Sequence, residues 1–473
     1  MSESENTPKT EGHDPTVPEA WSAFMRQGWG DRELDLPAHP VATYAAARRR
    51  RLADAFPGQR LVLPAGGYKV RANDTDYRFR PDTAHTYFSG NQTSDAVLVI
   101  EPGSDGAEAT LFARPRSSRE SDEFFRDRQY GELWAGRRPS LGEIADSLQL
   151  RTRHLDELAD HLRGEAKTRV LRGIDARLDA IVEGDEEQDK EFARVASEMR
   201  LLKDEWELSQ LAEACDITTL GFEDSVRDWE NVLKYGERWI EGTFFRRARA
   251  MGNDIGYDSI VGGGKHATTL HWIENSGPVT PGELLLLDMG VENTNLYTAD
   301  VTRTIPVNGR FTSLQRDLYE LVYAAQEAGI AAAVPGQPFQ SIHQASMTVL
   351  AHGLGDMGLL PVSAEEALDP ESKVYSRWTL HGTSHMLGMD VHDCAQSSQE
   401  AYYKGELAES MVLTVEPGLY FQEDDLLVPE ELRGIGIRIE DDIVITADGP
   451  HNLSASLPRT VDDVEGWMER LQG

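Results

Sequence analysis

Cysteine is scarce in this chain of 473 residues. The two cysteines, Cys215 and Cys394, could form one disulfide at most, and neither has the spacing of a metal-binding or redox motif. So few cysteines are ordinary for a protein of a reducing compartment. We therefore predict a cytoplasmic protein.

Long apolar runs are also lacking, and basic residues are few. No run approaches the roughly 18 apolar residues of a membrane-spanning helix, and the polar start lacks the basic and apolar regions of an export signal. With 81 acidic against 47 basic residues the formal net charge is −34, which repels nucleic acids and anionic membrane surfaces. We expect no nucleic acid and no membrane partner. The acidity is typical of a solvated surface, or it attracts cationic ligands such as peptide amino termini.

The composition is that of a folded protein, with 40% hydrophobic and 27% charged residues. The length allows two or three domains, and the pattern along the chain favours two. Residues 1–20 lack apolar periodicity and predict a mobile tail. Residues 21–195 mix helices with short apolar strands, such as 60–67 and 96–103, which indicates an α/β domain.

The pattern changes beyond a charged stretch at residues 183–191. In residues 196–473, long helices at about 197–228, 314–334 and 338–354 alternate with pairs of strands. This order favours an α+β domain over a doubly wound parallel sheet.

Two aspartates flank a turn-prone segment in this second domain. Asp288 and Asp300 lie in strand-like runs on either side of Asn293-Thr294-Asn295, so a hairpin centred on Thr294 would place them directly opposite each other. Opposed Cβ atoms on antiparallel strands lie about 5 Å apart, and two carboxylates there repel unless a cation lies between them. The pair therefore predicts a metal site.

Further candidate ligands follow in order along the chain. Glu416 ends the strand-like run MVLTVEPG, and Glu440 shares one face of an alternating strand with Arg438. His385 lies in HGTSHMLGMDVHD, whose glycines argue against a continuous helix. Four carboxylates and one imidazole without a thiolate suit two divalent ions, and the oxygen-rich set favours manganese.

The order of these motifs resembles the pita-bread metallopeptidases over residues 197–460. The form of HGTSHMLGMDVHD and the segment RANDTDYRFRPDTAHTYFSG (71–90) resemble the aminopeptidase P branch. This resemblance implies a creatinase-like N-terminal domain before a catalytic pita-bread (creatinase/aminopeptidase) domain. It also implies an Xaa-Pro aminopeptidase, a dinuclear enzyme that removes the first residue from peptides with proline second. The expected assembly is a homo-oligomer, a dimer or tetramer.

The resemblance also implies roles for single residues. Attack by a hydroxide that bridges the two metals is expected, with Glu416 as general acid and base and His271 and His392 as hydrogen-bonding groups for the peptide. The proline pocket would involve His381 and Tyr420, with Arg438 orienting a carboxylate. The metal ligands would be Asp288, Asp300, His385, Glu416 and Glu440.

Three alternatives stay open on the same fold. A prolidase would cleave only Xaa-Pro dipeptides, a non-catalytic module would bind peptides, and a creatinase-like enzyme would hydrolyse a small molecule. Residues 393–415 contain no arginine, whereas some members of the family use one there on the C-terminal side of the substrate. This departure leaves the preference for longer peptides undecided.

Overall fold

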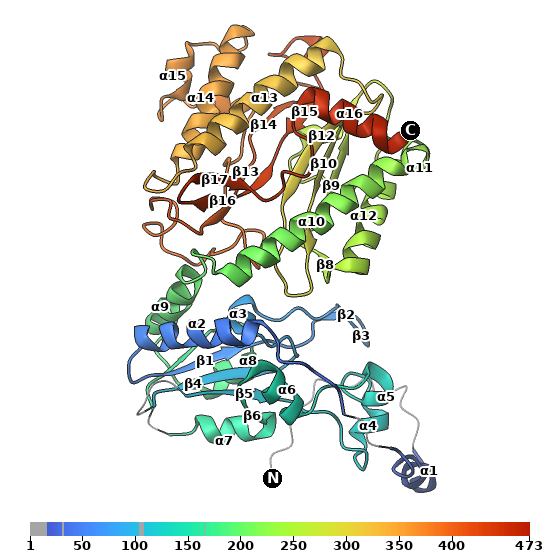
Figure 1. The fold of residues 1–473 in the computed structure, drawn as a ribbon, viewed down its shortest axis with the longest axis vertical. Helices are drawn as coiled ribbons and strands as arrows, with labels where there is room; N and C mark the ends of the chain where they lie inside the picture. Colours follow the sequence, from blue (N-terminus) through green and yellow to red (C-terminus); the bar gives the residue numbers. More distant parts are fainter. Residues whose placement is uncertain (1–16, 31–32, 104–107, 165) are drawn as a thin grey trace. The chain divides into compact units, whose positions relative to one another are not determined.

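The computed structural model describes residues 17–30, 33–103, 108–164 and 166–473, and it divides into two compact units, Met1–Lys190 and Glu191–Gly473 (Figure 1). Of the tail predicted for residues 1–20, residues 1–16 lie outside the described part of the chain, and helix α1 (Glu19–Met25) begins before residue 20. Every helix in the described residues is too short or too polar to traverse a lipid bilayer.

The described part of the first unit contains a mixed five-stranded sheet with the order β6-β5-β4-β1-β7. Strand β4 pairs antiparallel with β1 and β5, whereas β6 and β7 add in parallel at the edges. All residues of β1 are buried, so both faces of the sheet are covered at its centre. The strands are β1 (Arg60–Pro64), β4 (Val97–Glu101), β5 (Glu108–Ala113), β6 (Arg151–His154) and β7 (Thr168–Val170).

Helices of the first unit begin at side-chain caps where the sequence supplies them. Asp82 accepts a hydrogen bond from the third residue of α3, and Ser140 forms a capping box at α6. A small hairpin pairs β2 (Val70–Ala72) with β3 (Thr75–Asp76). The helices are α2 (Val41–Ala55), α3 (Thr83–Ser89), α4 (Glu123–Arg126), α5 (Glu132–Ala135), α6 (Leu141–Leu148), η1 (Leu155–Glu157), α7 (Leu158–Leu162) and α8 (Ala176–Ile181).

The helix predicted at about 197–228 is interrupted in the structure. Helix α9 (Glu186–Glu198) ends early, and α10 (Glu205–Arg227) begins at a capping box formed by Asp204 and Glu207. The cap satisfies free backbone N–H groups at a new helix start, so the prediction of one continuous helix is wrong. The other helices of the second unit are α11 (Trp229–Tyr235), α12 (Glu237–Met251), α13 (Ser313–Ala332), α14 (Ser341–Asp356), α15 (Ala364–Leu368) and α16 (Val461–Gln472), with the short 3₁₀ helices η2 (Gly264–Thr268), η3 (Val374–Arg377) and η4 (Glu430–Leu432).

Short antiparallel sheets of the second unit carry the residues of interest. The sheets have the orders β12-β10-β9, β13-β16-β17, β14-β15 and β11-β8. A large apolar cluster joins α10, α12, α13 and α14 to the fully buried β10. The strands are β8 (Asp254–Ile255), β9 (Ile260–Gly263), β10 (Leu284–Met289), β11 (Val291–Glu292), β12 (Val301–Pro306), β13 (Val412–Val415), β14 (Gly418–Phe421), β15 (Ile435–Arg438), β16 (Asp441–Thr446) and β17 (Gly449–Asn452).

Candidate active site

Two predicted metal ligands lie on one hairpin of the second unit. Asp288 is part of β10, Asp300 immediately precedes β12, and the two strands pair antiparallel. The register pairs Asp288 with Thr302, so the prediction that Asp288 lies directly opposite Asp300 is wrong by two residues. Alternate residues of a strand share a face, and both carboxylates therefore still point the same way.

The turn of this hairpin explains the shifted register. The carbonyl of Asn293 accepts from the N–H of Leu296, and the N–H of Asn293 donates to the carbonyl of Tyr297 at 2.8 Å. Leu296 has a φ of 67°, a left-handed conformation that is uncommon for leucine and that the sequence does not signal. The turn is consequently centred on Asn295, one residue after the predicted centre at Thr294.

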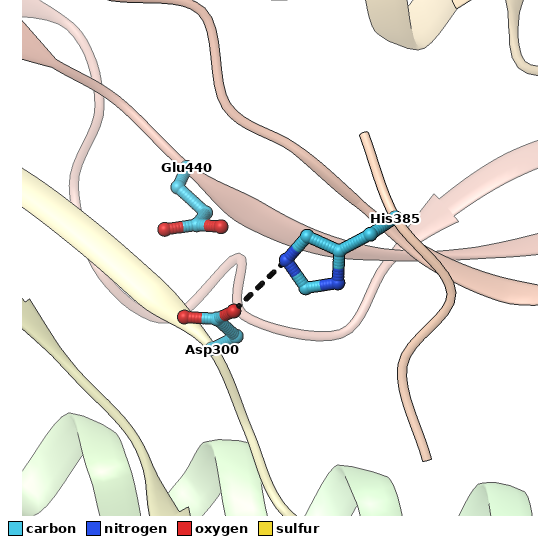
Figure 2. A group of neighbouring side chains, drawn as sticks. All are labelled: Asp300, His385 and Glu440. Atoms are coloured by element: carbon cyan, nitrogen blue, oxygen red, sulfur yellow. Dashed lines mark ion pairs between the residues drawn. The ribbon is translucent and has the colours of Figure 1, made fainter. Parts of the chain in front are cut away.

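A donor cluster forms where this hairpin meets two distant segments (Figure 2). One ligand atom each from Asp300, His385 and Glu440 lies within 4.8 Å of the others. The Nε2 atom of His385 is 3.3 Å from Oδ2 of Asp300 and 3.6 Å from Oε1 of Glu416. His385 comes from the irregular segment before β13, Glu416 follows β13, and Glu440 lies between β15 and β16.

Asp288 faces the same cavity but has two protein partners. Its Oδ2 accepts from Nη2 of Arg438 at 2.6 Å, and its Oδ1 accepts from the hydroxyl of Tyr257 at 2.6 Å. A carboxylate oxygen has a second lone pair, so these contacts leave acceptor capacity for a cation. Tyr257 was not predicted from the sequence.

Burial and repulsion by neighbouring carboxylates raise the pKa values of Glu440 and Asp288. For Glu440, burial and then the charges of Asp300, Glu416 and Asp288 raise the pKa well above its ordinary value. Burial raises the pKa of Asp288 to about 6, although Arg438 opposes the rise. Crowded buried carboxylates are stabilised by bound cations, so the donor set fits divalent metal ions.

The imidazoles and Glu416 respond to the same charges. Although burial opposes protonation, the hydrogen bond to Asp300 and the charge of Glu416 raise the pKa of His385 to about 9. Burial likewise opposes ionisation of Glu416, but His381 and His385 hold its pKa below the ordinary value. Burial and the neighbouring His385 lower the pKa of His392. Glu416 is therefore ionised and His392 neutral near pH 7.

The cluster opens into a cavity of about 540 Å³ within the second unit. All the predicted site residues except Tyr420 line this cavity. Its lining residues are Tyr257, Asp258, Ile260, Leu270, His271, Ile273, Asp288, Asp300, His381, Gly382, Ser384, His385, Val391, His392, Tyr403, Glu416, Arg438 and Glu440.

Tyr420 lies behind the cavity wall and joins two of the lining residues. Its hydroxyl is 2.8 Å from Nε2 of His381 and accepts from Nη1 of Arg438 at 2.9 Å. Burial raises the pKa of Tyr420 to about 12, so its hydroxyl keeps its proton. The ring of His392 lies 4.4 Å from that of His385, whereas His271 comes from an exposed loop.

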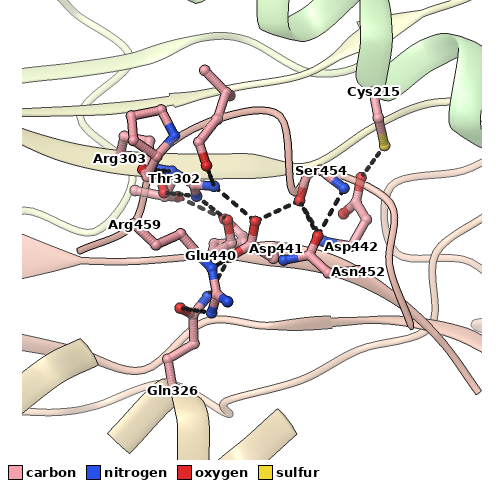
Figure 3. A network of polar contacts seen from close by, with 12 residues as sticks. Cys215, Thr302, Arg303, Gln326, Glu440, Asp441, Asp442, Asn452, Ser454 and Arg459 are labelled. Carbon is pink, nitrogen blue, oxygen red and sulfur yellow. Dashed lines mark hydrogen bonds and ion pairs between the residues drawn. The ribbon is translucent and has the colours of Figure 1, made fainter. Parts of the chain in front are cut away.

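A polar network that was not predicted holds Asp300 and Glu440 through hydrogen bonds to their backbone and side chains (Figure 3). The hydroxyl of Thr302 donates to Oε2 of Glu440 at 2.6 Å, and Arg303 donates to the backbone carbonyl of Glu440 at 2.6 Å. Asp442 accepts from the backbone N–H of Asp300 and from the thiol of Cys215, both at 3.1 Å. Thr302 could have been found from strand alternation, because it is two residues after Asp300.

A buried charge cluster supports the histidine segment. Asp393 follows His392 and is 1% exposed. Its carboxylate accepts from Nε of Arg200 at 3.1 Å and from Nζ of Lys203 at 3.1 Å. Both basic residues come from the segment between α9 and α10 that was predicted to be helical. Their separation of about 190 positions from Asp393 leaves no local signal in the sequence.

Comparison with known proteins gives matches over both units. The model of metallopeptidase family M24 matches residues 209–447, and that of the aminopeptidase P N-terminal domain matches residues 45–171. The protein Xaa-Pro aminopeptidase 1 of Streptomyces coelicolor is 52% identical over 463 residues, which are 97% of this chain and 94% of that protein.

Solved structures give the same result. Aminopeptidase P from Escherichia coli with the inhibitor Pro-Leu is 29% identical, with a TM-score of 0.80 over 92% of this chain and 99% of that chain. The zinc-substituted form of the E. coli enzyme in complex with product is 30% identical, with a TM-score of 0.81 over 92% of this chain and 100% of that chain.

Proposed function

Because the chain belongs to metallopeptidase family M24 and carries the N-terminal domain of aminopeptidase P, we propose how its own residues perform the reaction of an Xaa-Pro aminopeptidase. The enzyme is metal-dependent and releases the first residue from peptides whose second residue is proline. The predicted family, the pita-bread fold of the second unit and the aminopeptidase activity are confirmed by the matches over nearly the whole chain.

The metal ligands are Asp288, Asp300, His385, Glu416 and Glu440. The observation that carries this assignment is the buried cluster in which donor atoms of Asp300, His385 and Glu440 lie within 4.8 Å of one another. Four carboxylates balance the charge of two divalent ions, and the oxygen-rich set favours manganese. When bound, the two ions polarise the scissile carbonyl and lower the pKa of water.

Glu416 is the group that moves the proton. Its ionised carboxylate lies beside His385 and 3.4 Å from Nδ1 of His381, so it can accept a proton from the attacking water and deliver it to the proline nitrogen. His271 and His392 come from two separate segments of the lining and hydrogen-bond the scissile carbonyl and the peptide. His381, Tyr420 and Arg438 form a hydrogen-bonded set at the proline side of the cavity.

The charges of the cavity favour longer peptides over dipeptides. Arg438 is the only arginine or lysine among the described residues that line it, and Asp288 already pairs with this guanidinium. A prolidase must bind the free carboxylate of an Xaa-Pro dipeptide, which requires an available cation or an equivalent set of donors. The engaged Arg438 therefore supports an aminopeptidase over a prolidase.

Assembly, location and domain limits complete the proposal. A homo-oligomer, a dimer or tetramer, is supported by exposed apolar side chains of the first unit such as Phe24 and Trp134, which are 76% and 57% exposed.

The two unpaired, buried cysteines suit a cytoplasmic location. The N-terminal domain extends over residues 21–195 and the catalytic domain over residues 196–473.

A peptidase assay tests the proposed function. Protein stripped with a chelator should cleave an Xaa-Pro-Xaa tripeptide only after a divalent ion is restored, with manganese compared against zinc and cobalt. Cleavage of an Xaa-Pro dipeptide alone would make the enzyme a prolidase. Absence of cleavage of either peptide with every metal would contradict the catalytic assignment.

A further inference from the structure

We propose that Glu237, which does not line the cavity, is a positioning residue for His271. Glu237 is the first residue of α12, and its side chain is fully buried. His271 lies on the segment of residues 263–277, which includes η2 and is called here the His271 loop. The inference rests on the proposed function, in which His271 contacts the peptide.

One carboxylate joins the two ends and the middle of this loop. A carboxylate has two oxygens with about four acceptor positions, and each oxygen of Glu237 meets two N–H groups. The partners of Oε1 are the backbone N–H of Gly263 at 2.8 Å and Nδ1 of His266 at 2.8 Å, and those of Oε2 are Nε1 of Trp272 at 2.9 Å and the backbone N–H of Gly277 at 2.6 Å.

The neighbouring residues His271 and Trp272 contact different parts of the molecule. His271 is exposed and lines the cavity, whereas the indole of Trp272 stacks on His266 with ring centroids 4.0 Å apart and donates to Glu237. The backbone beside His271 is thus tied through Trp272 to the buried Glu237. A shift of the indole would move the imidazole of His271 with it.

A side chain at the end of the loop would collide with this arrangement. A Cβ atom on Gly277 would lie 2.4 Å from Nδ1 of His266 and 2.8 Å from Oε1 of Glu237, so only glycine allows this approach. Glutamine at position 237 would have nearly the same size, but its NH₂ group would face the N–H groups of Trp272 and Gly277 in one orientation and the N–H of Gly263 in the other. The site therefore requires a carboxylate.

The test uses the mild variant Trp272→Phe, which keeps the ring stack and removes one hydrogen bond, together with Glu237→Gln. With the metal-loaded enzyme and an Xaa-Pro-Xaa tripeptide, we expect each to lower kcat about tenfold with a smaller change in KM, because small misplacement of a catalytic group is costly. The matched control is Trp239→Phe, on the same helix as Glu237. This indole also donates to a carboxylate, Oδ2 of Asp228 at 2.6 Å, and stacks on Tyr235, and its loss should leave kcat within about twofold.

A double-mutant cycle with His271→Ala separates positioning from a general structural role. If Trp272 acts through His271, Trp272→Phe should change kcat by less than about twofold in the His271→Ala background. An equal loss in both backgrounds, full activity of Trp272→Phe, or full activity of His271→Ala would each overturn the role of Glu237. Failure of the wild-type enzyme to cleave any Xaa-Pro peptide would instead contradict the proposed function.

Discussion

At the scale of single residues, replacing one of the crowded carboxylates should lower the activity without lowering the stability of the metal-free protein. Asp300→Asn and Glu440→Gln should lower turnover more than about a hundredfold. Mutation of a residue that only supports a metal ligand already lowers metal affinity or activity roughly 10–100-fold, and these residues are ligands themselves. In chelated protein, Glu440→Gln should not lower the midpoint of urea unfolding, because it removes a carboxyl group whose ionisation is unfavourable beside the other buried carboxylates. Exposed Glu409→Gln is the control. Near-normal turnover of either variant would contradict its assignment as a metal ligand.

Residue types and their order predicted nine of the eighteen residues that line the cavity, all of them with charged or imidazole side chains. The motifs around Asp288, His385 and Glu440 carried that prediction, and the structure brings these residues together. Glu237 and Tyr257 could not be predicted in this way. Their roles depend on backbone N–H groups, an indole and a carboxylate that lie far away in sequence, and such contacts leave no spacing to detect.

At the scale of elements, the segment between α9 and α10 should stabilise the catalytic unit through charge. Asp393→Asn removes the carboxylate that pairs with the buried Arg200 and Lys203 and should lower the free energy of unfolding by on the order of 3 kcal/mol. The exposed pair formed by Lys404 gives a control, since Lys404→Met should change this free energy by less than about 1 kcal/mol. Urea unfolding measures both, and equal effects would contradict the buried pair's contribution.

Element types were easier to predict than element limits. Apolar periodicity indicated α13 and α14 to within three residues at each end, because long amphipathic helices leave a strong pattern. The break before α10 and the register of the β10–β12 hairpin were missed. Both depend on local backbone geometry, a cap at Asp204 and a left-handed Leu296, which side-chain periodicity does not report.

At the scale of the whole molecule, a buried histidine should make the first unit sensitive to acid. His85 is fully buried, its Nδ1 lies 2.8 Å from the carbonyl of Leu63, and burial lowers its pKa to about 4. In the unfolded chain this imidazole binds a proton below its ordinary pKa of 6.5, whereas the folded chain does so only near 4. Stability should therefore fall by about 2 kcal/mol between about pH 7 and pH 5 from this group.

The variant His85→Asn places an amide N–H at the position of the imidazole Nδ1, so it keeps a donor for Leu63 and cannot titrate. Urea unfolding of the variant and the wild type at the two pH values should show a smaller loss in the variant. An identical loss in both proteins would mean that His85 is not the source of the acid sensitivity.

The register of the β10–β12 hairpin limits how this enzyme can be redesigned. Strands alternate their faces, so a one-residue slip of β12 against β10 would turn Asp300 to the side away from Asp288. A longer turn at Asn293–Tyr297 keeps the site only if the pairing of Asp288 with Thr302 is unchanged. An engineer who grafts a tag or a reporter loop here must therefore preserve that pairing.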